Sequence, residues 1–261
     1  IMGKICPVIW FELEHLMRNK LMWFLTSAYS LSVIIICLID TLRITYFHAI
    51  QSVPVMCLDF ILPILLVILQ IVTLSPIFAG GINQQSNQIP ATCVIGRKRR
   101  SIAKLCGGVL FSLGMCLLLI VITWLISWLC GTYDAHFLIT NIDGEVLSPV
   151  WDTRQHILFS VLCLITGSVI LSIILLCLSC FAKTSLNAVS VSSIAVLFEY
   201  LFHFFSFSVF LKEYNFWLLF QPYYFFNMVL PFLPHINYFL LSLAFVPLCV
   251  VAIIGIIKRG A

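Results

Sequence analysis

Residues 105–130 form an unbroken apolar run, "LCGGVLFSLGMCLLLIVITWLISWLC", that contains no charged residue. An α-helix rises about 1.5 Å per residue, and about 20 apolar residues cross the hydrocarbon core of a bilayer. Similar runs recur along the chain: 62% of the 261 residues are apolar, and 9% are charged. A soluble domain of this length could not bury so much apolar surface. The sequence therefore predicts an all-α polytopic membrane protein, with residues 1–261 as a single domain.

Six apolar runs of this kind predict six transmembrane helices. Their boundaries are residues 21–38, 55–78, 105–130, 156–181, 186–210 and 238–257. Only the four residues "AKTS" separate the fourth run from the fifth, so these two helices are expected to form a tight hairpin. Six spans with short connections leave no room for a separate soluble domain.

Two further segments differ from an ordinary span. Within residues 1–20, apolar side chains recur at helical spacing and charged residues lie mostly off that stripe, which predicts a helix in the membrane interface. Residues 212–235 are apolar and aromatic but are broken by Pro222, Pro231 and Pro234. Such backbone is tolerated at membrane depth only where protein or a water-filled cavity satisfies it. This segment is therefore expected to be re-entrant and to dip into the outer leaflet.

The lysines and arginines predict the orientation of the chain. If the N-terminus is cytoplasmic, three of the 14 cations lie outside, namely Arg43, Arg154 and Lys212. The other eleven then lie on the cytoplasmic side: Lys4, Arg18, Lys20, Arg97, Lys98, Arg99, Arg100, Lys104, Lys183, Lys258 and Arg259. Cytoplasmic loops carry the excess of cations. The sequence therefore predicts a multi-pass protein of the cell membrane with both termini cytoplasmic.

Four polar residues interrupt the apolar runs and are candidates for a translocation path or for interhelical contacts: Asp59, Gln70, Glu199 and His203. Asp59 is near the outer end of its span, so the simpler interpretation is that it reaches the headgroups. Glu199 and His203 are one helical turn apart and could hydrogen-bond each other. Gln70 could bond across to almost any neighbouring helix. An ionisable group at the bilayer centre costs about 3 kcal/mol unless it is paired or faces water.

Motifs for catalysis are absent from the sequence. There is no HExxH motif, no double glutamate of the kind that some membrane proteases use, and no GxxxxGK[ST] sequence for binding ATP. No cysteine pair has metal-ligand spacing with a histidine nearby, so most of the eleven cysteines are interpreted as small buried apolar residues. The chain is therefore expected to have no catalytic residue, no metal site and no cofactor of its own.

Four consecutive cations, Arg97, Lys98, Arg99 and Arg100, precede the run 105–130. Nucleic acid is the least favoured partner, because no soluble domain or interleaved aromatic surface accompanies them. An anchor that fixes the cytoplasmic face and contacts anionic membrane lipids explains them directly. A role in docking a partner protein is compatible with that anchor.

The order of these parts is more specific than any one of them. An N-terminal "FELEHLMRNKLMWF" helix, two spans, a basic "GRKRRSIAK" segment, a third span, a hairpin and a broken segment before the sixth span cover nearly the whole chain. This order resembles that of ABC-2 type transporter permeases. The resemblance implies the membrane subunit of an ATP-binding cassette exporter, not itself an enzyme. It further implies a homodimer or heterodimer of permeases, with two separate ATPase subunits that bind ATP and Mg. Substrates of the family include peptides, antibiotics and lipid-like molecules.

The resemblance also implies where the ATPase docks. In such permeases the interfacial helix and the segment between spans two and three form the docking surface, which here are residues 10–20 and the coupling segment 82–104. The residues expected on that surface are Glu14, Arg18, Arg97, Lys98, Arg99, Arg100 and Lys104. Relatives often have an acidic residue at the start of the coupling segment, where this chain has "GGINQQSNQIP" with none.

The alternative is an ATP-independent secondary carrier, or an accessory membrane protein, that uses Glu199 and His203. Secondary carriers often contain internal repeats. Residues 1–130 and 131–261 show no convincing repeat of each other. Transport that survives ATP depletion but collapses with the proton gradient would favour this alternative.

Overall fold

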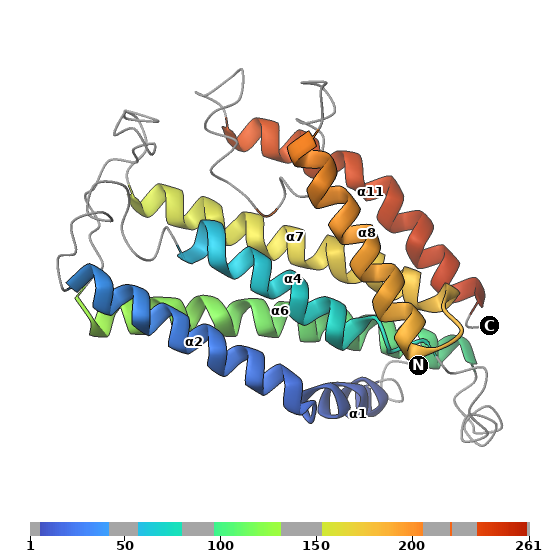
Figure 1. The fold of residues 1–261 in the computed structure, drawn as a ribbon. Coiled ribbons are helices and arrows are strands. Elements are labelled where there is room, and N and C mark those ends of the chain that lie inside the picture. Colours follow the sequence, from blue (N-terminus) through green and yellow to red (C-terminus); the bar gives the residue numbers. More distant parts are fainter. Residues whose placement is uncertain are drawn as a thin grey trace.

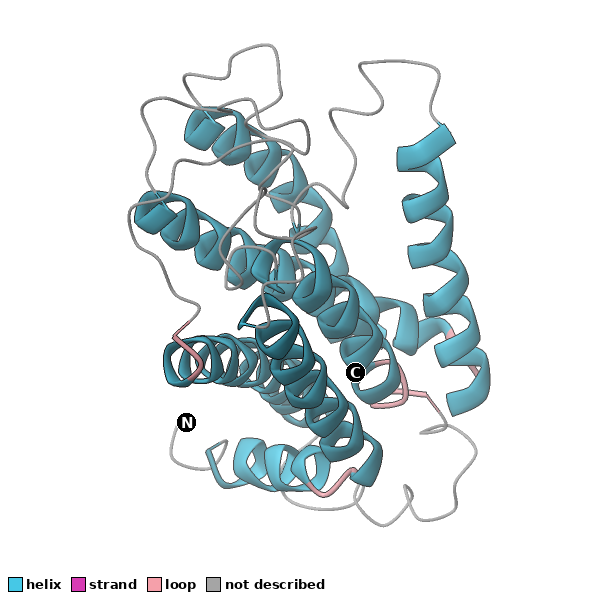
Figure 2. Ribbon diagram, turned by 60° about the vertical axis from the view of Figure 1, so that its left-hand side comes forward, coloured by secondary structure: helices cyan, strands magenta, loops and turns pink. Residues whose placement is uncertain are grey.

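The computed structural model describes residues 6–41, 57–79, 97–131, 153–205, 220 and 234–259. Within these residues the regular structure is helical and contains no strand (Figure 2). Five helices of the described residues are long and apolar enough to cross a membrane. The chain is therefore all-helical where it is described, as the sequence predicts, and has the character of a multi-pass membrane protein.

The first two helices meet at a sharp corner. Helix α1, Cys6–Met17, lies across one end of the bundle, and α2, Lys20–Thr41, runs away from it (Figure 1). The side chain of Asn19 accepts a hydrogen bond from the amide of Leu21 at 3.0 Å, which is the pattern of a helix N-cap. The indole Nε1 of Trp23 donates to the carbonyl of Met17 at 2.8 Å and so satisfies the end of α1. These two bonds fix the separate helix that the sequence predicts within residues 1–20.

The second long helix begins with an irregular turn. A π-helical turn, η2, covers Cys57–Ile61 and continues into α4, Leu62–Leu74. Pro63 has no amide hydrogen to donate to the carbonyl of Asp59, which disfavours a regular α-helical start. A π-turn in a helix is rare and frequently occurs at functional sites. This turn carries Asp59, one of the polar residues singled out from the sequence.

Helix α6, Arg97–Leu129, has 33 residues and is about 50 Å long. It is longer than the roughly 30 Å hydrocarbon core of a bilayer. Gly131, with φ +68°, follows the helix and adopts the left-handed conformation that commonly ends one. The coupling segment predicted for residues 82–104 is thus in part the start of α6, because residues 97–104 are continuous with the long apolar helix. Residues 82–96 lie outside the described residues.

The second half of the chain contains a hairpin and a final helix. Helix α7, Thr153–Phe181, is followed after three residues by α8, Ser185–Phe205, and α11 covers Pro234–Arg259. The apolar part of α8 is residues 185–201 and is shorter than the five candidate spans. The described residues therefore support five crossings, whereas the sequence predicts six. Of the re-entrant segment predicted at 212–235, only Phe220 and residues 234–235 are described.

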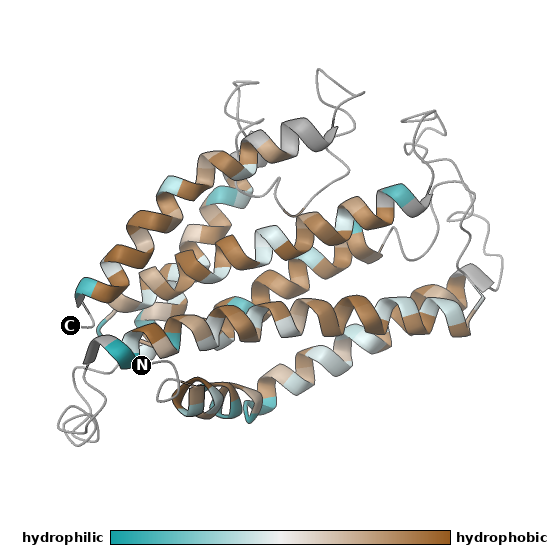
Figure 3. Cartoon of the chain, turned by 180° about the vertical axis from the view of Figure 1, so that it is seen from behind, coloured by the Kyte–Doolittle hydropathy of each residue, from teal (hydrophilic) through white to brown (hydrophobic). Residues whose placement is uncertain are grey.

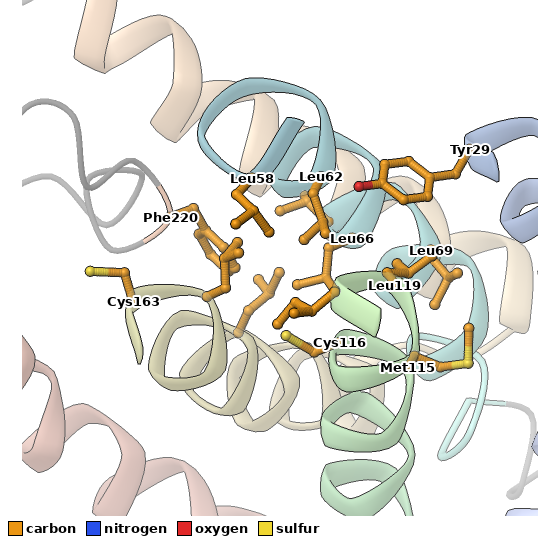
Figure 4. Close-up of a cluster of buried hydrophobic side chains, with 14 of the residues drawn as sticks. Tyr29, Leu58, Leu62, Leu66, Leu69, Met115, Cys116, Leu119, Cys163 and Phe220 are labelled. Carbon is orange, nitrogen blue, oxygen red and sulfur yellow. The ribbon is translucent and has the colours of Figure 1, made fainter. Parts of the chain in front are cut away.

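The core lies where α4, α6 and α7 meet. Figure 4 shows Phe220 beside Leu58, with Leu62 and Leu66 further along α4, and all four side chains are fully buried. Large apolar side chains also cover the outer surface, as Figure 3 shows for the helices as a whole. Exposed examples are Phe24, Leu125, Leu158 and Val251. Such a surface suits lipid and would be unfavourable in water.

Two adjacent glycines let α6 pass closely between its neighbours. A Cβ atom on Gly107 would lie 3.4 Å from the Cβ of Glu12 on α1. A Cβ atom on Gly108 would lie 2.9 Å from Cδ1 of Leu176 on α7. At Gly108 a Cβ atom would require the end of the Leu176 side chain to move, whereas at Gly107 it would only just reach van der Waals contact with α1. Small residues here let α6 pack closely against α1 and α7.

Candidate functional site

Polar side chains join α4 to α7 at three levels along their length. The contacts are Asp59 with Ser160, Gln70 with Ser168, and the backbone of residues 78 and 79 with Ser179. The partners are 101, 98 and 100 to 101 residues apart in sequence, as expected for two parallel helices in a nearly constant register. From Ser160 to Ser179 the rise is about 28 Å, close to the thickness of a bilayer core. We call these three contacts the polar ladder.

The first contact of the polar ladder holds the carboxyl group of Asp59. The hydroxyl of Ser160 donates to Oδ1 of Asp59 at 2.8 Å, and the Asp59 residue is 1% exposed. Asp59 is therefore buried among protein groups in this structure, whereas the simpler interpretation from the sequence has it reach the headgroups. A carboxyl group inside a membrane bundle is costly and usually has a function. Asp59 remains a candidate for the translocation path, now as a group inside the bundle.

The middle contact joins three helices. The Nε2 group of Gln70 donates to Oγ of Ser112 on α6 at 2.6 Å and to Oγ of Ser168 on α7 at 2.7 Å. The two serine hydroxyls are themselves 2.6 Å apart. All three side chains are fully buried, and Oε1 of Gln70 has no hydrogen-bond partner among the described residues. In this structure Gln70 is an interhelical contact, with one acceptor left unsatisfied.

Replacing Gln70 with methionine is expected to change the free energy of unfolding by less than about 1 kcal/mol. The variant loses two interhelical hydrogen bonds, each worth about 0.6 kcal/mol inside a membrane. It also removes a buried carbonyl that costs about 1–3 kcal/mol when unsatisfied. Unfolding in mixed micelles measures the change. Gln70→Ala is the matched comparison, because it removes the same bonds but leaves a cavity and should destabilise more. Equal losses for both variants would contradict this balance.

Other polar contacts lie outside the polar ladder. The hydroxyl groups of Tyr29 on α2 and Thr123 on α6 hydrogen-bond each other in the buried interior. The ammonium group of Lys104 on α6 donates to the carbonyl of Ile77 at 2.8 Å, just beyond the end of α4. Hydrogen bonds between helices of a bundle fix their register. If the helices slid past each other, the donors and acceptors would lose their partners and find no water in the lipid to replace them.

The lysines and arginines whose side chains the structure describes gather at one end of the bundle, which we call the basic end. These seven residues belong to the turn after α1, the starts of α2 and α6, the turn between α7 and α8, and the end of α11 (Figures 1 and 3). They are Arg18, Lys20, Arg99, Arg100, Lys104, Lys183 and Lys258. The side chains of Arg97 and Lys98 on α6 and of Arg259 on α11, at the same end, lie outside the described residues. So does the side chain of Arg154, whose backbone belongs to the start of α7 at the opposite end.

The outward face of α1 is exposed at the basic end. Arg18 and Glu14 form an ion pair at 2.6 Å, one turn apart, and the Arg18 side chain is 77% exposed. Trp10 and Phe11 are also exposed, at 71% and 66%, whereas Leu16 is buried against the bundle. An exposed ion pair adds little stability. The outward face of α1 therefore presents exposed charged and aromatic side chains.

The candidate pair on α8 is only partly described. Glu199 is half-buried on α8, and His203 lies one turn later on the same helix. The side chain of His203 lies outside the described residues. The structure therefore places both residues on α8, whereas Asp59 belongs to η2 and Gln70 to α4.

The serines of α7 are the residues that the sequence analysis overlooked. Ser160, Ser168, Ser172 and Ser179 are all fully buried, and three of them form the polar ladder. At 100° per residue these four positions fall within an arc of about 120° on the helix. That shared face was the available signal, because small polar residues often mark the contact face of a membrane helix.

No group of three histidine, cysteine or acidic side chains that could hold a metal ion occurs in the described part of the chain. The cysteines there form no disulfide, and those at 37, 57, 116 and 163 are buried. Comparison of the sequence with protein-family models and with curated proteins finds no match. The chemistry of the chain must therefore be argued from its own residues.

Proposed function

We propose that the chain is the membrane-spanning permease subunit of an ATP-binding cassette exporter of the ABC-2 type. It works as a homodimer or heterodimer of permeases and with two separate ATPase subunits, which bind ATP and Mg. Closure of the ATPases on ATP pushes on the docking surface, rocks the bundle and opens an outward path between two permease copies. The substrate is a peptide, an antibiotic or a lipid-like molecule.

In this proposal the basic end faces the cytoplasm of a bacterial cell, and both termini lie there. The asymmetry of the cations supports that orientation, because positive loops are retained on the cytoplasmic side. Helix α8 provides the sixth crossing: its 21 residues give a length of about 32 Å, which is sufficient for a bilayer core. Residues 212–235 form the re-entrant segment on the outer side.

The observation that carries the proposal is the position of α1 beside the start of α6 at the basic end. Glu12 of α1 approaches Gly107 of α6, three residues beyond the end of the expected docking segment 82–104, which supports a docking surface made of both segments. Glu14 on α1, Arg18 just after α1 and Arg99 on α6 are all exposed. Two separate stretches of the sequence thus each expose charged side chains at the same end of an apolar bundle.

Replacing Arg97, Lys98, Arg99 and Arg100 together with glutamine is expected to leave a correctly inserted permease that retains little ATPase. The tagged chain is purified in mild detergent from its own cells, and the bound subunit carrying GxxxxGK[ST] is quantified. Loss of interface charge should reduce its recovery at least about tenfold. Replacing Lys183 and Lys258 with glutamine is the matched control at the same end. If the unaltered chain never retains an ATPase, the proposed function loses its support.

A further inference from the structure

The turn after α4 is held from two sides by other helices. It comprises Ser75–Ala79, the last described residues before the unmapped part of the coupling segment. The ammonium group of Lys104 on α6 donates to the carbonyl of Ile77 at 2.8 Å and lies 5.4 Å from the centre of the Phe78 ring. From α7, Oγ of Ser179 accepts hydrogen bonds from the amides of Phe78 and Ala79, at 3.0 and 3.1 Å.

The chemistry of these contacts makes the turn dependent on two side chains. Carbonyl groups at a helix C-terminus carry partial negative charge and attract a cation. Amide groups without a partner are costly inside a membrane protein, and one buried hydroxyl satisfies two of them here. Ser179 is fully buried, so water does not compete for those bonds. The path of the chain out of α4 is therefore set by Lys104 and Ser179.

Lys104 also lies close to α1. Glu12 of α1 packs against Gly107, three residues further along α6. Lys104 is therefore hydrogen-bonded to the end of α4, while its own backbone belongs to the part of α6 that lies beside α1. Its side chain thus connects that part of α6 to the turn after α4.

We propose that Lys104 and Ser179 form a clasp on the Ser75–Ala79 turn, and that this clasp transmits movement of the docking surface to α4. This inference rests on the proposed function for the source of the movement. Lys104 and Ser179 are positioning residues: they touch neither ATP nor substrate. When α1 and the start of α6 shift together, the Lys104 bond to Ile77 pulls the end of α4, while Ser179 holds the turn against α7. The polar ladder then carries the shift along α4 through contacts with α7.

Hydrogen exchange of the full chain in nanodiscs, with its captured ATPase, tests the clasp directly. Lys104→Met and Ser179→Ala are each expected to speed amide exchange in the Ser75–Ala79 turn about tenfold or more. Lys104→Arg keeps the donor and the contact with Phe78, and should restore slow exchange. Lys183→Met, an exposed cation at the same end, is the matched control and should leave the turn unchanged. Unchanged exchange in both Lys104→Met and Ser179→Ala would overturn the clasp.

The same samples separate the clasp from the proposed function. A non-hydrolysable ATP analogue should change exchange in the turn of the unaltered complex and of Lys104→Arg, but not of Lys104→Met. If the ATPase is captured and the analogue leaves the unaltered turn unchanged, the clasp does not transmit movement, although the proposed function stands. If no ATPase is captured at all, the proposed function fails and transmission fails with it, while fast exchange in Lys104→Met still shows that Lys104 holds the turn.

Discussion

Replacing Gly108 with leucine is expected to lower the free energy of unfolding by about 2–3 kcal/mol, because overpacking a tight helix contact forces side chains and backbone apart. The first added carbon alone would lie 2.9 Å from Cδ1 of Leu176. Alanine is tolerated better at this position, since the end of the Leu176 side chain can move. Leucine adds three further carbons, and α6 and α7 must then separate.

The matched control for Gly108→Leu is Gly114→Leu on the same helix. A Cβ atom on Gly114 has nothing within 4 Å, so leucine there extends into open space at the helix surface. Both variants gain the same helix propensity, and the difference between them isolates the packing cost. Unfolding in mixed micelles measures both. A Leu176→Ala change should recover part of the loss in Gly108→Leu, because the two side chains then share the space. Equal free energies of unfolding for Gly108→Leu and Gly114→Leu would contradict the prediction.

The helices could be predicted from the sequence because lipid imposes a strong pattern. A span needs about 20 apolar residues, and the run 105–130 contains no charge at all. The predicted end of the fourth span at residue 181 coincides with the end of α7. Starts were less accurate: α6 begins at Arg97 and α11 at Pro234, because a helix continues through polar residues once it leaves the hydrocarbon. Apolar composition therefore predicts which residues lie in the hydrocarbon core, but it does not predict where each helix begins.

The candidate site was harder to predict for a physical reason. Asp59 and Gln70 stood out because each is unusual in an apolar run, but Ser160, Ser168 and Ser179 did not, since serine is common in membrane helices. The partners lie about 100 residues away, and only the parallel packing of α4 and α7 brings them together. Lys104 was expected on the docking surface, and its bond to Ile77 depends on where α4 ends, which hydropathy does not specify.

The far end of the polar ladder gives a prediction in which two variants have opposite signs. Replacing Asp59 with leucine is expected to raise the free energy of unfolding by about 1–3 kcal/mol, because well-packed apolar groups often stabilise a core more than buried charged groups do. Replacing Ser160 with alanine is expected to lower it by about 1–3 kcal/mol, because the carboxyl group then loses a donor while it stays buried. The contribution of this hydrogen bond to the free energy of unfolding therefore cannot be taken from either single variant.

The double variant tests whether the loss of stability in Ser160→Ala comes from the carboxyl group of Asp59. With Asp59→Leu in place, Ser160→Ala should cost little, because no carboxyl group remains to be satisfied and a lone serine hydroxyl can bond to its own helix. Unfolding of the four proteins in the same mixed micelles gives the coupling between the two sites. A loss of stability in Asp59→Leu as large as that in Ser160→Ala would instead show that Asp59 stabilises the fold.

The expected gain in stability has a further consequence. A chain that is more stable without a buried carboxyl group retains that group at a cost in stability, which is typical of a functional site. Asp59 in its π-helical turn is then the first position at which to test the proposed translocation path.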